Sequence, residues 1–217
     1  KMQNKNLNNL KIAMHQMNTV VGDISGNLAK VKQLLKSNDK ADIHVFPETT
    51  FTGYLCGSLL DRYEFIKDNE QALQDLVDFV NGTHFENKVI IIGYISFHGM
   101  DEAGFPIIKN SVACINQGKV QRYDKQLLAN GDHHEDRKYF KSGYDSKVFN
   151  VSLGYHKDLV IGCPICEDNW FTDHDRNIPE EMVQLGAEII ISINQSYFYY
   201  GKQLKRYKLF SQIAKHN

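Results

Sequence analysis

Short runs of β-branched and apolar residues are the feature that most restricts the fold of this chain. The stretch "KVIIIGYISF" (88–97) predicts a buried strand. "NSVACINQGKVQRYDK" (110–125) contains two such runs around Asn116, Gln117 and Gly118. Two apolar runs joined by a short turn that contains glycine predict a β-hairpin. None of the runs approaches the roughly 20 residues that span a bilayer, so the chain is expected to build sheets rather than membrane helices.

Helical and strand patterns alternate on either side of this region. Residues 10–18 and 42–48 predict strands, and residues 27–37 place leucine and valine at helical spacing, with Ser25 as the expected N-cap. The long segment 58–80 has helical spacing in at least two pieces. The chain therefore begins with the alternation that is typical of α/β proteins.

The last quarter of the chain repeats the alternation. "DLVIGCPICED" (158–168) starts as a strand, "IPEEMVQLGA" (178–187) predicts a helix, and "EIIISINQS" (188–196) predicts another strand. Residues 202–217 predict the start of a further helix. A chain of 217 residues with this pattern is expected to form one α/β domain with a mixed sheet.

Charge and cysteine content exclude several classes of function. The formal net charge is −1 and no basic block is present, so neither nucleic acid nor an acidic membrane surface is an expected partner. Four cysteines do not make a disulfide framework, and the first residues lack the apolar core of a secretory signal. A reducing, cytoplasmic location is therefore expected.

The pair Cys163 and Cys166 has the Cys-x-x-Cys spacing of redox and metal sites. A redox pair is disfavoured because Glu167 and Asp168 would raise the pKa of a neighbouring thiol. A zinc site would need further ligands, and the adjacent His133 and His134 would point in divergent directions. Burial of both cysteines as small apolar residues is the simplest alternative.

The position of Cys166 nevertheless suits a nucleophile. It follows an apolar strand at a turn into an acidic helix start, and open α/β sheets carry their chemistry at the carboxyl ends of strands. Glu48 and Lys125 also follow predicted strands. A glutamate or lysine at the end of a strand is usually a solvated side chain, so residue type alone does not assign a catalytic role to either.

Together these segments resemble the nitrilase, or carbon-nitrogen hydrolase, superfamily, and more closely the N-terminal glutaminase domain of glutamine-dependent NAD synthetases. The similar motifs are "VVGDISGN" (20–27), "FPETTFTGY" (46–54), "GSLLDRYEF" (57–65), "YDKQLL" (123–128), "GCPICEDNWF" (162–171) and "INQSYFYYGK" (193–202). The resemblance implies a four-layer α-β-β-α sandwich. It also implies Glu48 as general base, Lys125 as electrostatic stabiliser and Cys166 as nucleophile, with no metal or organic cofactor for glutamine hydrolysis.

The same resemblance implies substrate contacts. Glu167 is expected to bind the glutamine ammonium group, and Ser196 and Lys202 match positions that hold the amino-acid end. Cys163 then needs only a packing role.

Several positions depart from the family pattern. Gly131 stands where the family has a tyrosine, and Gln195 and Tyr197 stand where it prefers alanine and proline. The acidic pair after the lysine is reversed, so either Glu135 or Asp136 is expected to support Lys125.

The chain ends at Asn217 within a predicted helix, so on this resemblance residues 1–217 are expected to be a truncated nitrilase-like glutaminase domain of a longer enzyme. The resemblance implies a further synthetase domain that would use ATP and Mg2+, and association into a homo-oligomer. Two alternatives to glutaminase activity remain open. One is an amidase for another small carboxamide, and the other is a catalytically silent docking module.

Overall fold

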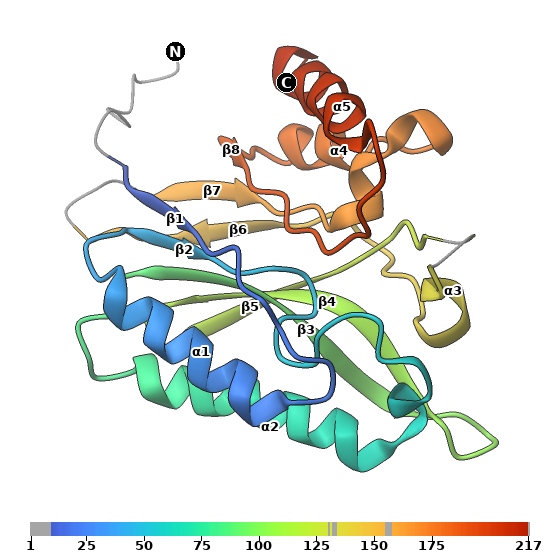
Figure 1. Ribbon diagram of the computed structural model, residues 1–217. Helices are drawn as coiled ribbons and strands as arrows, with labels where there is room; N and C mark the ends of the chain where they lie inside the picture. Colours follow the sequence, from blue (N-terminus) through green and yellow to red (C-terminus); the bar gives the residue numbers. More distant parts are fainter. Residues whose placement is uncertain (1–9, 130, 132–133, 155–157, 217) are drawn as a thin grey trace.

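The computed structural model of the protein describes residues 10–129, 131, 134–154 and 158–216. Figure 1 shows two sheets stacked between two layers of helices. The helices near the N-terminus cover one face of the larger sheet, and the smaller sheet lies on its other face, with the last two α-helices of the chain beyond it. This is the expected four-layer α-β-β-α sandwich.

The larger sheet has five strands in the order β1-β2-β3-β4-β5. Their bounds are β1 Ile12–Met14, β2 Ile43–Val45, β3 Val89–Met100, β4 Pro106–Asn116 and β5 Lys119–Asp124. β1, β2 and β3 run parallel, whereas β3, β4 and β5 are antiparallel, so the sheet is mixed as expected. The predicted hairpin is confirmed: Gln117 and Gly118 both have positive φ, the geometry of a tight two-residue hairpin turn.

The smaller sheet has three strands in the order β6-β7-β8. They are β6 Val148–Val151, β7 Leu159–Gly162 and β8 Ile189–Ile190, with β6 antiparallel and β8 parallel to β7. β6 has no counterpart among the sequence predictions, since "VFNV" is too short to show a period of its own. Pairing with β7 supplies the context that the local sequence lacks.

The described helices are mostly short. The α-helices are α1 Ile24–Ser37, α2 Tyr63–Val80, α3 Asp136–Tyr139, α4 Ile178–Gln184 and α5 Lys202–His216, and the 3-10 helices are η1 Gly57–Asp61, η2 Cys166–Asn169 and η3 Phe171–Asp173. Ser25 is not the cap of α1. The side chain of Asp23 accepts the Gly26 N–H at 3.0 Å, and Ser25 lies inside the first turn. None of the described helices combines the length and the apolar character that a membrane crossing requires.

Two apolar clusters explain the layering. Along β3, Ile90 and Ile92 belong to the cluster with α1 and α2, whereas Val89 and Ile91 belong to the cluster with the smaller sheet. Successive side chains of a strand point to opposite faces, so both faces of β3 are covered. This is why "KVIIIGYISF" reads as a continuous apolar run rather than an alternating one.

Gly93, in the middle of β3, permits a close approach by the chain that follows β2. A Cβ at this position would lie 2.5 Å from the Cα of Glu48 and 2.5 Å from the carbonyl oxygen of Pro47. The two segments are also joined by hydrogen bonds from Gly93 N–H to Pro47 and from Thr50 N–H to Gly93. The absence of a side chain at residue 93 therefore sets the position of Glu48.

Candidate active site

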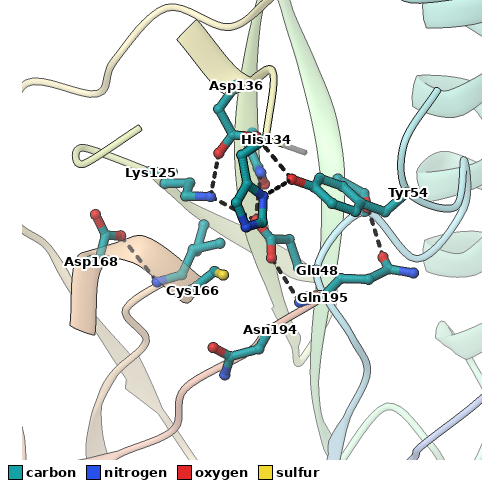
Figure 2. A network of polar contacts seen from close by, with 12 residues as sticks. Glu48, Tyr54, Lys125, His134, Asp136, Cys166, Asp168, Asn194 and Gln195 are labelled. Atoms are coloured by element: carbon teal, nitrogen blue, oxygen red, sulfur yellow. Dashed lines mark hydrogen bonds and ion pairs between the residues drawn. The ribbon is translucent and has the colours of Figure 1, made fainter. Parts of the chain in front are cut away.

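Three buried side chains from different strand ends meet between the two sheets. Glu48 follows β2, Lys125 follows β5 and Cys166 begins η2 just after β7. Their exposed fractions are 0%, 1% and 4%. Figure 2 shows the Cys166 sulfur facing the region where the Lys125 and Glu48 side chains meet. The structure thus brings together the three residues that the sequence singled out.

Lys125 is held between two carboxylates. Its Nζ lies 2.8 Å from Glu48 Oε1 and 2.6 Å from Asp136 Oδ2. Burial alone would lower the pKa of Lys125, but the charges on Glu48 and Asp136 outweigh burial and hold its pKa well above the usual range. Lys125 is therefore a permanent positive charge in a buried site, where its charge acts strongly on its neighbours.

Glu48 is fixed by further donors at both oxygens. Asn110 Nδ2, on β4, donates to Oε1 at 2.8 Å, and the backbone N–H of Gln195 donates to Oε2 at 2.8 Å. Asn110 lies on β4 of the larger sheet, whereas Gln195 lies in the segment that follows β8 of the smaller sheet. Sequence patterns gave no signal for either contact, because both depend on the way the two layers pack.

Cys166 sits at a sharp turn with a left-handed backbone, φ 47°. Non-glycine residues rarely adopt this conformation, and they do so mainly where the surrounding structure enforces it. Here the Cys166 N–H donates to the carbonyl of Ile193 at 2.9 Å, beside β8. The turn leaves the thiol facing Glu48 and Lys125.

Burial, followed by the charge on Glu48, raises the pKa of Cys166 above its usual range, while Lys125 opposes the shift. Glu167 acts in the direction expected from the sequence but contributes less than burial and Glu48. The resting group is a neutral thiol, which needs a base before it can attack.

Asp168 is a structural support that sequence reasoning missed. It is fully buried and accepts four hydrogen bonds, which come from the Tyr123 hydroxyl and from the backbone N–H groups of Gln126, Leu127 and Ile165. Burial raises its pKa to about 6. Because it ties the Cys166 turn to the segment after Lys125, it holds two catalytic candidates in register. An acid two residues after a cysteine, in an apolar context, was the available signal.

Cys163 does not take part in the site. It is completely buried in the core between the sheets, and burial raises its pKa well above the usual range. All four cysteines are free thiols. The spacing that suggested a redox or metal pair joins one packing residue, Cys163, and one site residue, Cys166.

The predicted substrate residues are less completely bonded than the catalytic ones. Glu167 accepts a hydrogen bond from His174 Nε2 at 3.0 Å. Lys202 is 8% exposed, and its Nζ donates to the Tyr197 carbonyl at 2.8 Å. Ser196 is half-buried and has no hydrogen bond to any of the residues that the structure describes.

Lys202 lies close enough to the site for its pKa to depend on residues of the site. Burial lowers the pKa of Lys202, while the negative charge of Glu167 acts in the opposite direction. Its ammonium group also lies 4.3 Å from the centre of the Tyr197 ring. The part of the chain that the structure describes offers it no carboxylate within ion-pair distance, so its charge remains free for an anionic ligand.

Of the two candidate supporting carboxylates, the structure places Asp136 against Lys125. Glu135 instead lies 3.5 Å from Lys138 at the surface. Glu135 precedes α3 and Asp136 begins it, so the two side chains point in different directions. Asp136 has a further neighbour in Tyr54, whose hydroxyl donates to it at 3.4 Å and also contacts His134 Nδ1 at 2.5 Å.

A zinc site beside the cysteines would have drawn on the adjacent His133 and His134. His133 lies outside the described residues, and the ring of His134 contacts Tyr54 and Tyr197. Within the described ranges, no group of three or more His, Cys, Asp or Glu side chains is arranged to hold a metal ion.

Comparisons with known proteins agree with the geometry. The family model "Carbon-nitrogen hydrolase" matches residues 11–212. The glutamine-dependent NAD(+) synthetase of Aquifex aeolicus is 28% identical over 196 residues, which are 89% of this chain and 31% of that protein. That of Thermotoga maritima is 29% identical over 94% of this chain and 33% of its own length. The chain thus spans about a third of the length of these curated relatives.

Solved structures give the same result. The glutamine-dependent NAD+ synthetase of Acinetobacter baumannii, solved with adenosine diphosphate, superposes with a TM-score of 0.79 at 26% identity, over 95% of this chain and 36% of that one. An amidase of the nitrilase superfamily from Nesterenkonia AN1 superposes with a TM-score of 0.75 at 15% identity, over 94% of this chain and 71% of that one. At 15% identity, the comparison with the amidase shows a shared fold only.

Proposed function

Because the chain belongs to the carbon-nitrogen hydrolase family, we propose that it hydrolyses the side-chain amide of glutamine through a thioester on Cys166. The observation that supports this most strongly is the placement of Lys125, which bridges Glu48 and Asp136 beside the Cys166 turn. A permanent cation, a carboxylate base and a thiol in one buried site match the requirements of amide hydrolysis.

The first half of the reaction forms the thioester. Glu48 takes the proton from the Cys166 thiol as the sulfur attacks the amide carbon. Lys125 stabilises the negative charge that develops on the carbonyl oxygen, a contribution of about 3 kcal/mol for one well-placed donor. Glu48 then returns the proton to the amide nitrogen, the carbon-nitrogen bond breaks, and ammonia leaves.

The second half releases the acid. Glu48 takes a proton from water, and the resulting hydroxide attacks the thioester carbon. The carbon-sulfur bond breaks, glutamate is released, and the sulfur recovers its proton from Glu48. The cycle is redox-neutral and regenerates the side chains of Glu48 and Cys166.

In the longer enzyme, the ammonia would serve the ATP-dependent conversion of deamido-NAD to NAD. This part of the proposal is supported by the names of the relatives, of which the chain covers about a third. ATP and Mg2+ would then belong to regions of those enzymes that this chain does not cover. A cytoplasmic location and association into a homo-oligomer are proposed on the family resemblance, and four free thiols suit a reducing compartment.

An alternative is hydrolysis of a different small carboxamide. It is favoured by one observation: the Glu167 carboxylate, expected to bind the glutamine ammonium group, already accepts a hydrogen bond from His174. A substrate that lacks an ammonium group would leave this bond intact.

The proposal is tested by measuring ammonia release from glutamine and from a panel of small amides without an α-amino group. We expect turnover with glutamine and a γ-glutamyl adduct on Cys166 by peptide mass spectrometry. Cys166→Ala is expected to remove both.

Cys163→Ala is the matched control, since Cys163 lies in the same turn region but is sealed in the core. It is expected to retain the adduct on Cys166. An adduct on Cys163 with none on Cys166 would overturn the assignment. Faster turnover of the simple amides than of glutamine would favour the alternative, and a Cys166 that is inert to a diazo-ketone glutamine mimic would indicate a silent docking module.

A further inference from the structure

The side chain of Gln195 makes two contacts that the proposed chemistry does not use. Its Oε1 accepts a hydrogen bond from the Thr49 hydroxyl at 2.9 Å, and its Nε2 donates to the Thr19 hydroxyl at 3.1 Å. Thr19 lies in the loop between β1 and α1, whereas Thr49 directly follows Glu48. One half-buried amide therefore joins three segments that are remote in sequence.

One of these two neighbours, Thr49, directly follows Glu48 in the chain. Thr49 has a left-handed backbone, φ 46°, although it is a β-branched residue. Such a conformation is held in place by surrounding contacts rather than by local preference. The Gln195 Oε1 is the acceptor that fixes the Thr49 hydroxyl, so it secures the turn from which the Glu48 side chain projects.

The backbone of the same segment contacts both the base and the nucleophile. The Ile193 carbonyl accepts the Cys166 N–H at 2.9 Å, and two residues later the Gln195 N–H donates to Glu48 Oε2 at 2.8 Å. The register of residues 193–195 therefore fixes the position of Glu48 relative to Cys166. β8 ends at Ile190, and beyond it only an isolated β-bridge between Ile165 and Ile193 continues the pairing of this segment among the described residues. The side-chain contacts of Gln195 therefore hold the end of the segment.

From this geometry we infer that Gln195 is a positioning residue: its side chain latches residues 193–195 onto Thr49 and Thr19 and thereby aligns Glu48 with the Cys166 thiol. This inference rests on the proposed roles of Glu48 and Cys166. The amide does not reach the reacting atoms itself, and it acts through the backbone N–H that it anchors.

Alkylation of Cys166 by iodoacetamide tests the latch without reference to the natural substrate. The rate is followed by peptide mass spectrometry from pH 6 to 9, because deprotonation of the thiol depends on Glu48. Gln195→Met preserves side-chain length and removes both hydrogen bonds, and it is expected to slow the alkylation of Cys166 about tenfold near neutral pH. Glu48→Gln is expected to slow alkylation further.

Three variants serve as controls. Thr49→Ser keeps the hydroxyl donor and is expected to react like the parent protein, and Gln203→Met changes an exposed glutamine on α5 with the same result expected. The double variant Gln195→Met/Thr49→Val is expected to be no slower than Gln195→Met, because both changes break the same contact. Thr19→Val removes only the outer anchor and provides a milder test if Gln195→Met does not fold.

The outcomes separate the latch from the underlying chemistry. A Gln195→Met rate within twofold of the parent rate, with Glu48→Gln slow, overturns the latch and leaves the proposed function standing. A rate in Glu48→Gln that equals or exceeds the parent rate overturns both, since Glu48 would then act on the thiol only through its charge, which raises the pKa of Cys166. A lower melting temperature for Gln195→Met with an unchanged pH profile of alkylation would reveal a purely structural role and would also overturn the latch.

Discussion

The two sides of the candidate site differ in how fully their polar groups are bonded. On the side of the five-stranded sheet, Glu48, Lys125 and Asp136 are at most 1% exposed and bond to one another. On the side of η2 and α5, Glu167 bonds to a neighbouring histidine, and Lys202 bonds only to a carbonyl among the described side chains and backbone. The charged groups of the first side are fully paired without a ligand, whereas those of the second side still have room for a charged partner.

This difference separates chemistry from recognition. Charges that are paired and buried before a substrate arrives need no reorganisation during the reaction, which is the basis of electrostatic catalysis. Groups whose bonds are incomplete can exchange a weak partner for a ligand. The comparison therefore predicts that damage to the first side affects folding and rate, whereas damage to the second affects substrate affinity.

The largest effect is expected from Lys125→Met. Removal of the ammonium group leaves two carboxylates buried without their cation, which should lower the free energy of unfolding by about 3 to 5 kcal/mol. Amide hydrolysis should be lost as well. Urea denaturation followed by circular dichroism measures the change in stability.

Lys109→Met is the matched control on the same sheet. Lys109 pairs with Asp124, which keeps Arg122 as a second partner at 3.0 Å, so the loss should be about 1 kcal/mol or less. Equal losses for the two variants would contradict the comparison. Neutralising both partners of Lys125, with Glu48→Gln and Asp136→Asn, should restore stability to Lys125→Met but not activity.

Acid should also lower the stability of the five-stranded sheet. His44, on β2 in the five-stranded sheet, is buried, and its Nδ1 lies 3.1 Å from His15 Nε2. Burial, assisted by the positive charges of His15 and Lys88, lowers the pKa of His44 to about 4. The unfolded chain takes up this proton near pH 6.5, so the stabilising contribution is complete above pH 6.5 and is lost as the pH falls toward 4.

The expected loss is about 3 kcal/mol of unfolding free energy over that interval. His44→Gln should remove this part of the pH dependence, as measured by urea denaturation at a series of pH values. His84→Gln, at an exposed histidine, should leave the pH profile unchanged. Parallel profiles for the parent protein and His44→Gln would show that another group causes the acid sensitivity.

The smallest effect is expected from a change on the side of η2 and α5. Lys202→Met should raise the KM for glutamine about tenfold and change kcat less than threefold, because a carboxylate contact made in both ground and transition states contributes to binding alone. Steady-state ammonia release provides both constants. Lys208→Met, at an exposed lysine on the same helix, should alter neither. A fall in kcat without a rise in KM would place Lys202 among the groups that act on the transition state.

Local patterns predicted the elements that carry their own signal. The hairpin at Gln117 and Gly118 and the buried run of β3 follow from turn chemistry and β-branched content. The cap of α1 was misassigned to Ser25, because Asp23 two residues earlier offers the same chemistry and the sequence does not fix which one begins the helix. β6 depends on pairing with β7 and was missed for that reason.

The site was predictable where residue type and order are specific. Glu48, Lys125 and Cys166 came from a motif resemblance, and the structure brings them together. The contacts of Asn110 and Gln195 with Glu48 link positions 62 and 147 residues apart, and only the packed layers create them. Choosing Asp136 over Glu135 likewise required the orientation of α3.

Gly93 has a consequence for the evolvability of this protein. Any larger residue there would collide with the backbone of Glu48, so saturation mutagenesis should recover glycine alone among active clones. The segment around Ser196 and Tyr199 carries no such restriction, since its side chains are half-buried or exposed. Single substitutions around Ser196 and Tyr199 can thus change substrate preference, while Gly93 keeps the position of Glu48, and with it the reaction chemistry, unchanged.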